Sequence, residues 1–109
     1  MPKNILYIMA DQMQAGALPM HGGPSLVPNM ERLARDGTVF DAAYCSSPIC
    51  APSRFSMMTG QLPHKVGAYD NSTEFPSSIP TFAHYLRNAG YRTCLSGKMH
   101  FVGPDQLHG

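Results

Sequence analysis

The first apolar run of the chain, Ile5 to Ala10, contains no polar residue and shows no alternation. This pattern is expected of a strand that is buried on both faces in a parallel sheet. Asp11 follows the run directly, so we expect its carboxylate at the carboxyl end of the strand, the sheet edge where ligands bind in α/β proteins. A hard oxygen there suits Ca²⁺, Mg²⁺ or Mn²⁺. The position is equally compatible with a carboxylate that only caps the next turn.

Two later segments share the order helix, glycine, strand. The first predicts a helix over residues 28–36, then Gly37 as a left-handed cap and a short strand over residues 38–40. The second predicts a helix that Pro80 opens and Gly90 closes, followed by a strand over residues 91–96. Apolar residues recur at helical spacing in both helices: Met30, Leu33 and Ala34 in the first, and Phe82, Tyr85, Leu86 and Ala89 in the second. This alternation favours α/β layering over an all-helical bundle.

Residues 15–29 and 61–79 are rich in glycine and proline, and we expect both to be loops on the surface. Asn71 lies in the second loop beside Asp70, where asparagine is commonly a turn residue. The local pattern assigns Asn71 no other role.

The stretch from Cys50 to Gly60 carries the most distinctive chemistry. Pro52 suits a first helical turn, Arg54 follows one turn in, and Gly60 suits the end of the helix. The amide groups and positive dipole end of a helix N-terminus, together with a guanidinium, would bind an oxyanion such as sulfate or phosphate beside the thiol. Taken singly, these residues are more typical of a buried cysteine and an ordinary helix start than of a catalytic site.

Lys98 and His100 lie two residues apart in a segment expected to be extended. Alternation along such a segment sends both side chains to the same side. The ammonium could neutralise a departing oxyanion, and the imidazole could give a proton to the alcohol that leaves with it. The alternative is a solvated lysine and a histidine with an ordinary structural partner.

Composition limits the classes of partner and site. The chain has 109 residues, which allows one domain or part of one, and its net charge of +1 with 14% charged residues argues against nucleic acid and membrane surfaces as partners. Three cysteines without a CxxC pair predict neither a disulfide framework nor a zinc site. Asp11 ends the first apolar run before a signal peptide or membrane span could form. We therefore expect a cytoplasmic protein.

The motif Cys50-Ala-Pro-Ser-Arg54, followed by four residues and Thr59-Gly60, resembles the signature of the type I sulfatases. Residues 4–11 resemble the opening strand of that family, residues 27–34 its first helix, and residues 97–100 its Gly-Lys-x-His segment. The resemblance covers essentially the whole chain, and its details are most similar to the bacterial choline sulfatase branch. Those details are Asp11-Gln12, Cys50–Phe55, Gly67–Asn71 and Cys94–Phe101.

The resemblance implies an alkaline-phosphatase-like α/β sandwich with a mostly parallel central sheet. Residues 1–109 would be the N-terminal portion of a single catalytic domain that is truncated at its C-terminal side, and we expect no closing helix or strand in residues 103–109. Cys50 would be oxidised to formylglycine by a formylglycine-generating enzyme or its equivalent. The motif read by that enzyme would be Cys50, Pro52, Ser53 and Arg54.

The resemblance also assigns roles to single residues. A divalent cation, Ca²⁺ in the first place with Mg²⁺ or Mn²⁺ as alternatives, would be bound by Asp11, Gln12 and the oxygen derived from Cys50. Arg54 would hold the hydrated aldehyde, which supplies one hydroxyl to attack sulfur and a second to expel sulfate. The groups in contact with the sulfate and the leaving oxygen would be Asn71, Lys98 and His100. Many sulfatases have a second aspartate where this chain has Gln12, and that difference favours the choline sulfatase branch.

The expected substrate is a small sulfate ester, choline O-sulfate, and the expected full-length protein is a homo-oligomer. A phosphonate, phosphate or aryl sulfate ester is the alternative within the same superfamily, because sulfuryl and phosphoryl transfer both need in-line geometry and charge neutralisation. A thiol or redox enzyme that uses Cys50 directly, and a binding module without catalysis, are the alternatives outside it. Since further metal ligands and the choline-binding groups of the family would follow Gly109, we expect no turnover from residues 1–109 alone.

Overall fold

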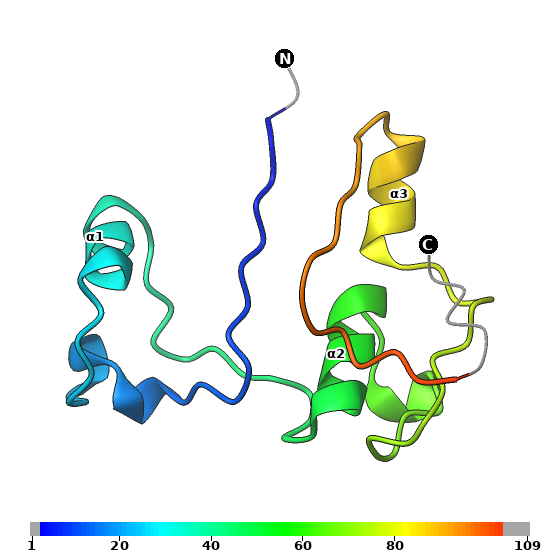
Figure 1. Cartoon of the computed structure of the whole chain (residues 1–109), viewed down its shortest axis with the longest axis horizontal. Coiled ribbons are helices and arrows are strands. Elements are labelled where there is room, and N and C mark those ends of the chain that lie inside the picture. Colours follow the sequence, from blue (N-terminus) through cyan, green and yellow to red (C-terminus); the bar gives the residue numbers. More distant parts are fainter. Residues whose placement is uncertain (1–2, 104–109) are drawn as a thin grey trace. The chain divides into compact units, whose positions relative to one another are not determined.

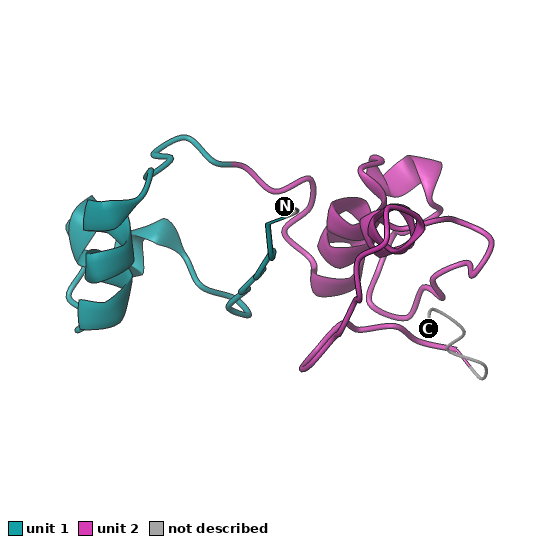
Figure 2. Cartoon of the chain, turned by 90° about the horizontal axis from the view of Figure 1, so that it is seen from above, with its two compact units in different colours: residues 1–43 teal, residues 44–109 magenta. Residues whose placement is uncertain are grey.

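The structure is a computed structural model, and it describes residues 3–103. Its helices are α1 (Pro28–Asp36), α2 (Cys50–Thr59) and α3 (Phe82–Asn88), with short 3-10 turns at Ala15–Ala17, Pro19–His21 and Pro63–Lys65 (Figure 1). The chain divides into two compact units, residues 1–43 and 44–109 (Figure 2). α1 belongs to the first unit, and α2 and α3 belong to the second.

The three predicted helices are confirmed. α1 has Pro28 at its first position, where the missing N–H of proline costs no hydrogen bond. α2 ends at Thr59 and is capped by Gly60, whose φ of 68° is the left-handed conformation that glycine adopts without strain. The N–H of Gly60 donates to the carbonyl of Ser56. α3 begins at Phe82, not at Pro80, because Thr81 is its N-cap and forms a capping box with His84.

The predicted left-handed cap at Gly37 is wrong. Gly37 is extended after α1, with φ of −124° and ψ of −157°. A glycine after a helix therefore permitted a left-handed turn without requiring one.

The predicted strands over residues 5–10, 38–40 and 91–96 are not strands in the structure, which has no strand within residues 3–103. A strand exists only where its backbone N–H and C=O groups bond to a neighbouring strand, and apolarity of the side chains does not supply that neighbour. The side chain of Leu6, in the middle of the first apolar run, is 85% exposed. The central parallel sheet expected from the sequence is therefore not confirmed.

The two predicted loops contain only 3-10 turns before α1 and between α2 and α3. The expectation that residues 61–79 lie on the surface is wrong in part, because Val66, Ala68 and Phe75 are buried in the core. No helix in the described part of the chain is both long enough and apolar enough to cross a membrane. The prediction that no helix or strand closes the chain concerns residues 103–109, and residues 104–109 lie outside the described part.

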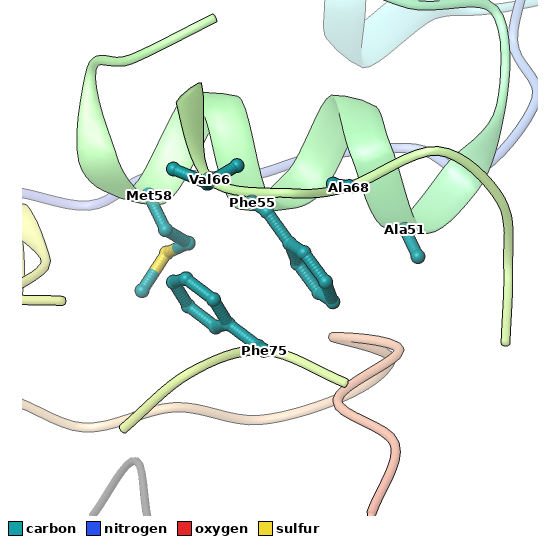
Figure 3. Packing of buried hydrophobic residues seen from close by; sticks show 6 residues of the cluster. All are labelled: Ala51, Phe55, Met58, Val66, Ala68 and Phe75. Atoms are coloured by element: carbon teal, nitrogen blue, oxygen red, sulfur yellow. The ribbon is translucent and has the colours of Figure 1, made fainter. Parts of the chain in front are cut away.

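The apolar core lies in the second unit. It joins three residues of α2 to three residues of the loop over residues 61–79: Ala51, Phe55, Met58, Val66, Ala68 and Phe75 (Figure 3). The ring of Phe55 is fully buried and stacks on that of Phe75, with centroids 4.4 Å apart and an interplanar angle of 13°.

The segment over residues 97–101 is packed against the same core. The ring centroid of Phe101 lies 5.1 Å from that of Phe75 and 6.0 Å from that of Phe55. Met99 also packs against the cluster. Three stretches are thereby held together: α2, the 61–79 loop that follows it, and residues 97–101, which come much later in the sequence. These stretches carry five of the residues that the sequence assigns to the site.

Candidate functional site

Cys50 is the first residue of α2, as the sequence predicts. Its side chain is partly exposed, whereas Ala51 and Pro52, which follow it in the first turn, are buried. Pro52 removes one of the N–H groups that a helix N-terminus leaves unbonded, and the N–H of Ser53 bonds to the carbonyl of Ile49 at 3.0 Å. The buried first turn thus presents the sulfur of Cys50 at its edge.

Arg54 lies one turn further along α2 and is only 6% exposed. Its Nη1 donates a hydrogen bond to the backbone carbonyl of Lys98. A buried guanidinium keeps its charge and must satisfy its donors within the protein. This bond ties the 97–101 segment to the helix that carries Cys50, in addition to the apolar packing of Phe101.

Lys98 brings its ammonium to the sulfur of Cys50, and Nζ lies 3.7 Å from Sγ. The two residues are 48 positions apart in the sequence. A cation beside the first residue of a helix adds to the positive end of the helix dipole, so a negative group bound here would be attracted by both. The structure therefore joins the two motifs that the sequence singled out for oxyanion chemistry.

His100 departs from the predicted extended conformation. Its φ of 62° is left-handed, which is uncommon for a residue other than glycine. Nε2 lies 3.1 Å from the carbonyl oxygen of Asn71; because a carbonyl only accepts, Nε2 carries a proton and donates it. Nδ1 is buried and has no hydrogen-bond partner among the described residues. Strict alternation does not explain this arrangement, because Lys98 contacts Cys50 while His100 contacts Asn71.

Asn71 contacts the N-terminus of α2 directly. Its side-chain oxygen accepts a hydrogen bond from the N–H of Ala51 at 2.9 Å. The N–H groups of the first helical turn have no partner within the helix, so Asn71 serves as a capping group from a distant loop. Sequence reasoning from the residues identified only a turn residue here, since no local pattern reports a contact across 20 positions.

The turn that presents Asn71 is held by Asp70 and Thr73. The carboxylate of Asp70 accepts bonds from the N–H and hydroxyl of Ser72, at 2.8 and 2.7 Å, and from the hydroxyl of Thr73 at 3.2 Å. The Ser72 hydroxyl and then its N–H hold the pKa of Asp70 below the ordinary value of 3.8. The sequence Asp-Asn-Ser-Thr is typical of such a turn and could have identified it.

The predicted metal ligands do not form a complete site in the described chain. Asp11 and Gln12 belong to the first unit, where they follow an extended segment and not a strand, and Gln12 has a left-handed φ of 55°. Residues 3–103 contain no group of three or more His, Cys, Asp or Glu side chains that could hold a metal ion. One carboxylate and one amide oxygen are too few for Ca²⁺, which takes about six to eight oxygen ligands.

The chain is similar to known sulfatases over nearly its whole length. The family model described as Sulfatase matches residues 3–106. A choline-sulfatase of Rhizobium meliloti is 56% identical over 97% of this chain, and an N-acetylglucosamine-6-O-sulfatase of Bacteroides thetaiotaomicron is 36% identical over 94% of it. The human N-acetylgalactosamine-6-sulfatase is 33% identical over 98% of the chain.

These alignments cover only part of each relative: 21%, 19% and 23% of their respective lengths. Sulfatase domains imply the alkaline-phosphatase-like fold, although the sheet of that fold is not formed within residues 3–103. With a family match over residues 3–106, the chain belongs to the sulfatase family.

Proposed function

We propose that the protein of which this chain is part hydrolyses a sulfate ester, and that the ester is choline O-sulfate. The choice of choline rests on the 56% identity to a choline-sulfatase, compared with 36% and 33% to two sugar sulfatases. One observation carries the chemistry: the ammonium of Lys98 lies 3.7 Å from the sulfur of Cys50 at the N-terminus of α2. Charge neutralisation of an oxyanion beside a reactive side chain is the main requirement of sulfuryl transfer.

We infer that Cys50 is the precursor of formylglycine and that the modifying enzyme reads Cys50, Pro52, Ser53 and Arg54. When converted, residue 50 would supply a hydrated aldehyde, with one hydroxyl to attack sulfur and a second to release sulfate. Its position at the edge of a buried first turn supports this role, because the neighbouring backbone is fixed while the side chain stays accessible.

We assign one further role in the reaction to each of three residues, Lys98, Arg54 and His100. Lys98 would neutralise charge on the sulfate oxygens, and Arg54 would hold the hydrated aldehyde while fixing Lys98 through its carbonyl. His100 would give a proton to the leaving alcohol. Since its Nε2 already carries a proton toward the carbonyl of Asn71, the acid form is the imidazolium, in which both nitrogens carry protons. Asn71 would contact the transferred group through its amide N–H donors.

A divalent cation is part of the proposal for the whole protein, with Ca²⁺ as the first choice and Mg²⁺ or Mn²⁺ as alternatives. Asp11, Gln12 and the oxygen of residue 50 would provide some of its ligands. The hard oxygen donors of Asp11 and Gln12 support this choice. A bound cation would neutralise sulfate charge, but the described residues do not complete its site.

We also propose that residues 1–109 form the N-terminal portion of a single catalytic domain, and that the protein acts in the cytoplasm as a homo-oligomer. The cysteines Cys45, Cys50 and Cys94 are all free, as a reducing compartment would keep them.

Mass spectrometry and kinetics on the full-length protein test the proposal together. We expect the peptide that contains Cys50 to have the lower mass of formylglycine, and kcat/KM to be higher for choline O-sulfate than for an aryl sulfate or a phenylphosphonate ester. Cys50→Ala should lose activity, while Cys94→Ala, which changes an exposed cysteine, should retain it. An unmodified thiol at residue 50 in the active protein would contradict the mechanism, and a preference for the phosphonate would contradict the substrate.

The 109-residue chain gives a separate test. It should hydrolyse no choline O-sulfate, because its described residues do not complete a cation site. Measurable turnover by the purified chain would show that residues 1–109 are sufficient and that this part of the proposal is wrong.

A further inference from the structure

The hydrogen bonds around Asn71 form one connected path between the N-terminus of α2 and His100. The side-chain oxygen of Asn71 accepts from the N–H of Ala51, which is the residue directly after Cys50. The backbone carbonyl of the same residue accepts from Nε2 of His100. One residue of a loop therefore contacts both the backbone beside the proposed nucleophile and the proposed general acid.

We propose that Asn71 is a positioning residue that sets the placement of residue 50 and of His100 relative to each other. The proposal rests on the function proposed above and adds to it, because a contact with the transferred group would use only the amide N–H donors. The contact with Ala51 uses the other half of the side chain, the oxygen, and acts through the helix backbone.

The Ala51 bond also orients the amide of Asn71. Carbonyl oxygen and amide nitrogen occupy opposite branches of the side chain, and an N–H donor such as Ala51 selects the oxygen. Only the two N–H donors of the amide then remain to contact an anion at the site. A free asparagine could present either end, so the bond to Ala51 would remove the half of its orientations that repel an oxyanion.

The surrounding turn is built to hold Asn71 in place. Asp70 accepts three hydrogen bonds from Ser72 and Thr73, and the Thr73 hydroxyl accepts from the N–H groups of Tyr69 and Asp70 at 3.3 and 3.4 Å. Ala68 and Phe75, on either side of this turn, are buried in the core with Phe55 of α2. The turn is therefore anchored at both ends, and the placement of Asn71 does not depend on its own bonds alone.

Asn71→Ala and Asn71→Asp in the full-length protein separate positioning from binding. Alanine removes the oxygen that caps Ala51, whereas aspartate keeps an oxygen there and removes the N–H donors. We expect Asn71→Ala to speed hydrogen exchange of the Ala51 amide by about fivefold or more, as the loss of a helix cap does, and Asn71→Asp to keep its exchange within about twofold of the wild type. Ser77→Ala, which removes a hydroxyl at an exposed position of the same loop, is the control. It should leave the exchange rate of the Ala51 amide unchanged.

Kinetics supply the readout that a merely structural role would not change. We expect Asn71→Ala to lower kcat by about tenfold or more and to change KM by less than about threefold, because the variant loses the side-chain bond to Ala51 while its backbone carbonyl can still accept from His100. Unchanged exchange at Ala51, or a raised KM with kcat unaltered, would overturn the proposal. If the wild type hydrolyses no sulfate ester, the proposed function is wrong, and the exchange experiment still decides whether Asn71 caps α2.

Discussion

Residues 3–43 and residues 44–103 contain similar apolar side chains but use them differently. None of the described residues in the first unit is buried, and the run Ile5 to Met9 is largely exposed. The second unit buries Phe55, Val66 and Phe75 in one cluster. An apolar residue is buried only when other parts of the chain pack against it, and α2 with its two neighbouring segments meets this condition.

The difference also separates the two halves of the proposed site. Cys50, Arg54, Asn71 and Lys98 lie on segments that share the core of the second unit, and each makes a hydrogen bond with another of these segments. Asp11 follows the exposed apolar run of the first unit. The residues proposed to contact the anion are therefore held by packing within the second unit, whereas the run that precedes Asp11 is exposed.

The largest effect is expected when Phe55→Ala is compared with Leu6→Ala. Phe55 is fully buried and stacked on Phe75, so its truncation should destabilise the second unit by about 3–5 kcal/mol and release residues 97–101. Leu6 is 85% exposed, and its truncation should change stability by less than about 0.5 kcal/mol. Hydrogen exchange of the α2 amides measures both, and equal effects would show that the core is not what holds the site.

Arg54→Met tests the polar link between α2 and the 97–101 segment. The variant keeps most of the apolar side chain but leaves the carbonyl of Lys98 without this donor, which should cost about 1–3 kcal/mol. We expect faster proteolysis near residue 98 in Arg54→Met and unchanged proteolysis in Arg92→Met, a matched change at an exposed arginine. Equal proteolysis of the two variants would assign the attachment of this segment to its other contacts, among them the packing of Met99 and Phe101.

Gly60→Ala tests the end of α2. Gly60 has a φ of 68°, which an alanine adopts only at a cost of about 1 kcal/mol, and the change should lower thermal stability accordingly. Gly16→Ala in the first unit is the control, because a Cβ there meets nothing within 4 Å and the backbone has no positive φ. A neutral Gly60→Ala would mean that α2 tolerates a different termination.

The smallest expected effect is the response of the Asn71 turn to acid. The pKa of Asp70 is lowered in the folded turn by its bonds to Ser72, so the charged carboxylate stabilises the turn above pH 3.8, and this contribution is lost as the pH falls through the lowered pKa. Exchange of the Ser72 amide should therefore rise, relative to its intrinsic rate, only below pH 3.8. Asp70→Asn should remove this step, and a step that persists in the variant would assign it to another group.

Much of the local structure followed from the pattern of residues. Pro28, Pro52 and Gly60 stand where they favour the beginning or end of a helix, and α1, α2 and α3 occur where they were predicted. The motif from Cys50 to Arg54 and the pair Lys98 and His100 also indicated the family, which the match over residues 3–106 confirms.

The sequence by itself therefore determined the helices and their limits to within two residues, because each depends on neighbours within one or two turns. It also indicated the residue types of the proposed oxyanion site. Only the tertiary structure decided that Asn71 caps the helix of Cys50, that Arg54 bonds to the carbonyl of Lys98, and that His100 turns back to Asn71. These contacts join residues 20 to 44 positions apart, and they form because the packing of Phe55, Phe75 and Phe101 closes the loops between them. The predicted strands failed for the same reason, since a strand requires a distant partner that no local pattern supplies.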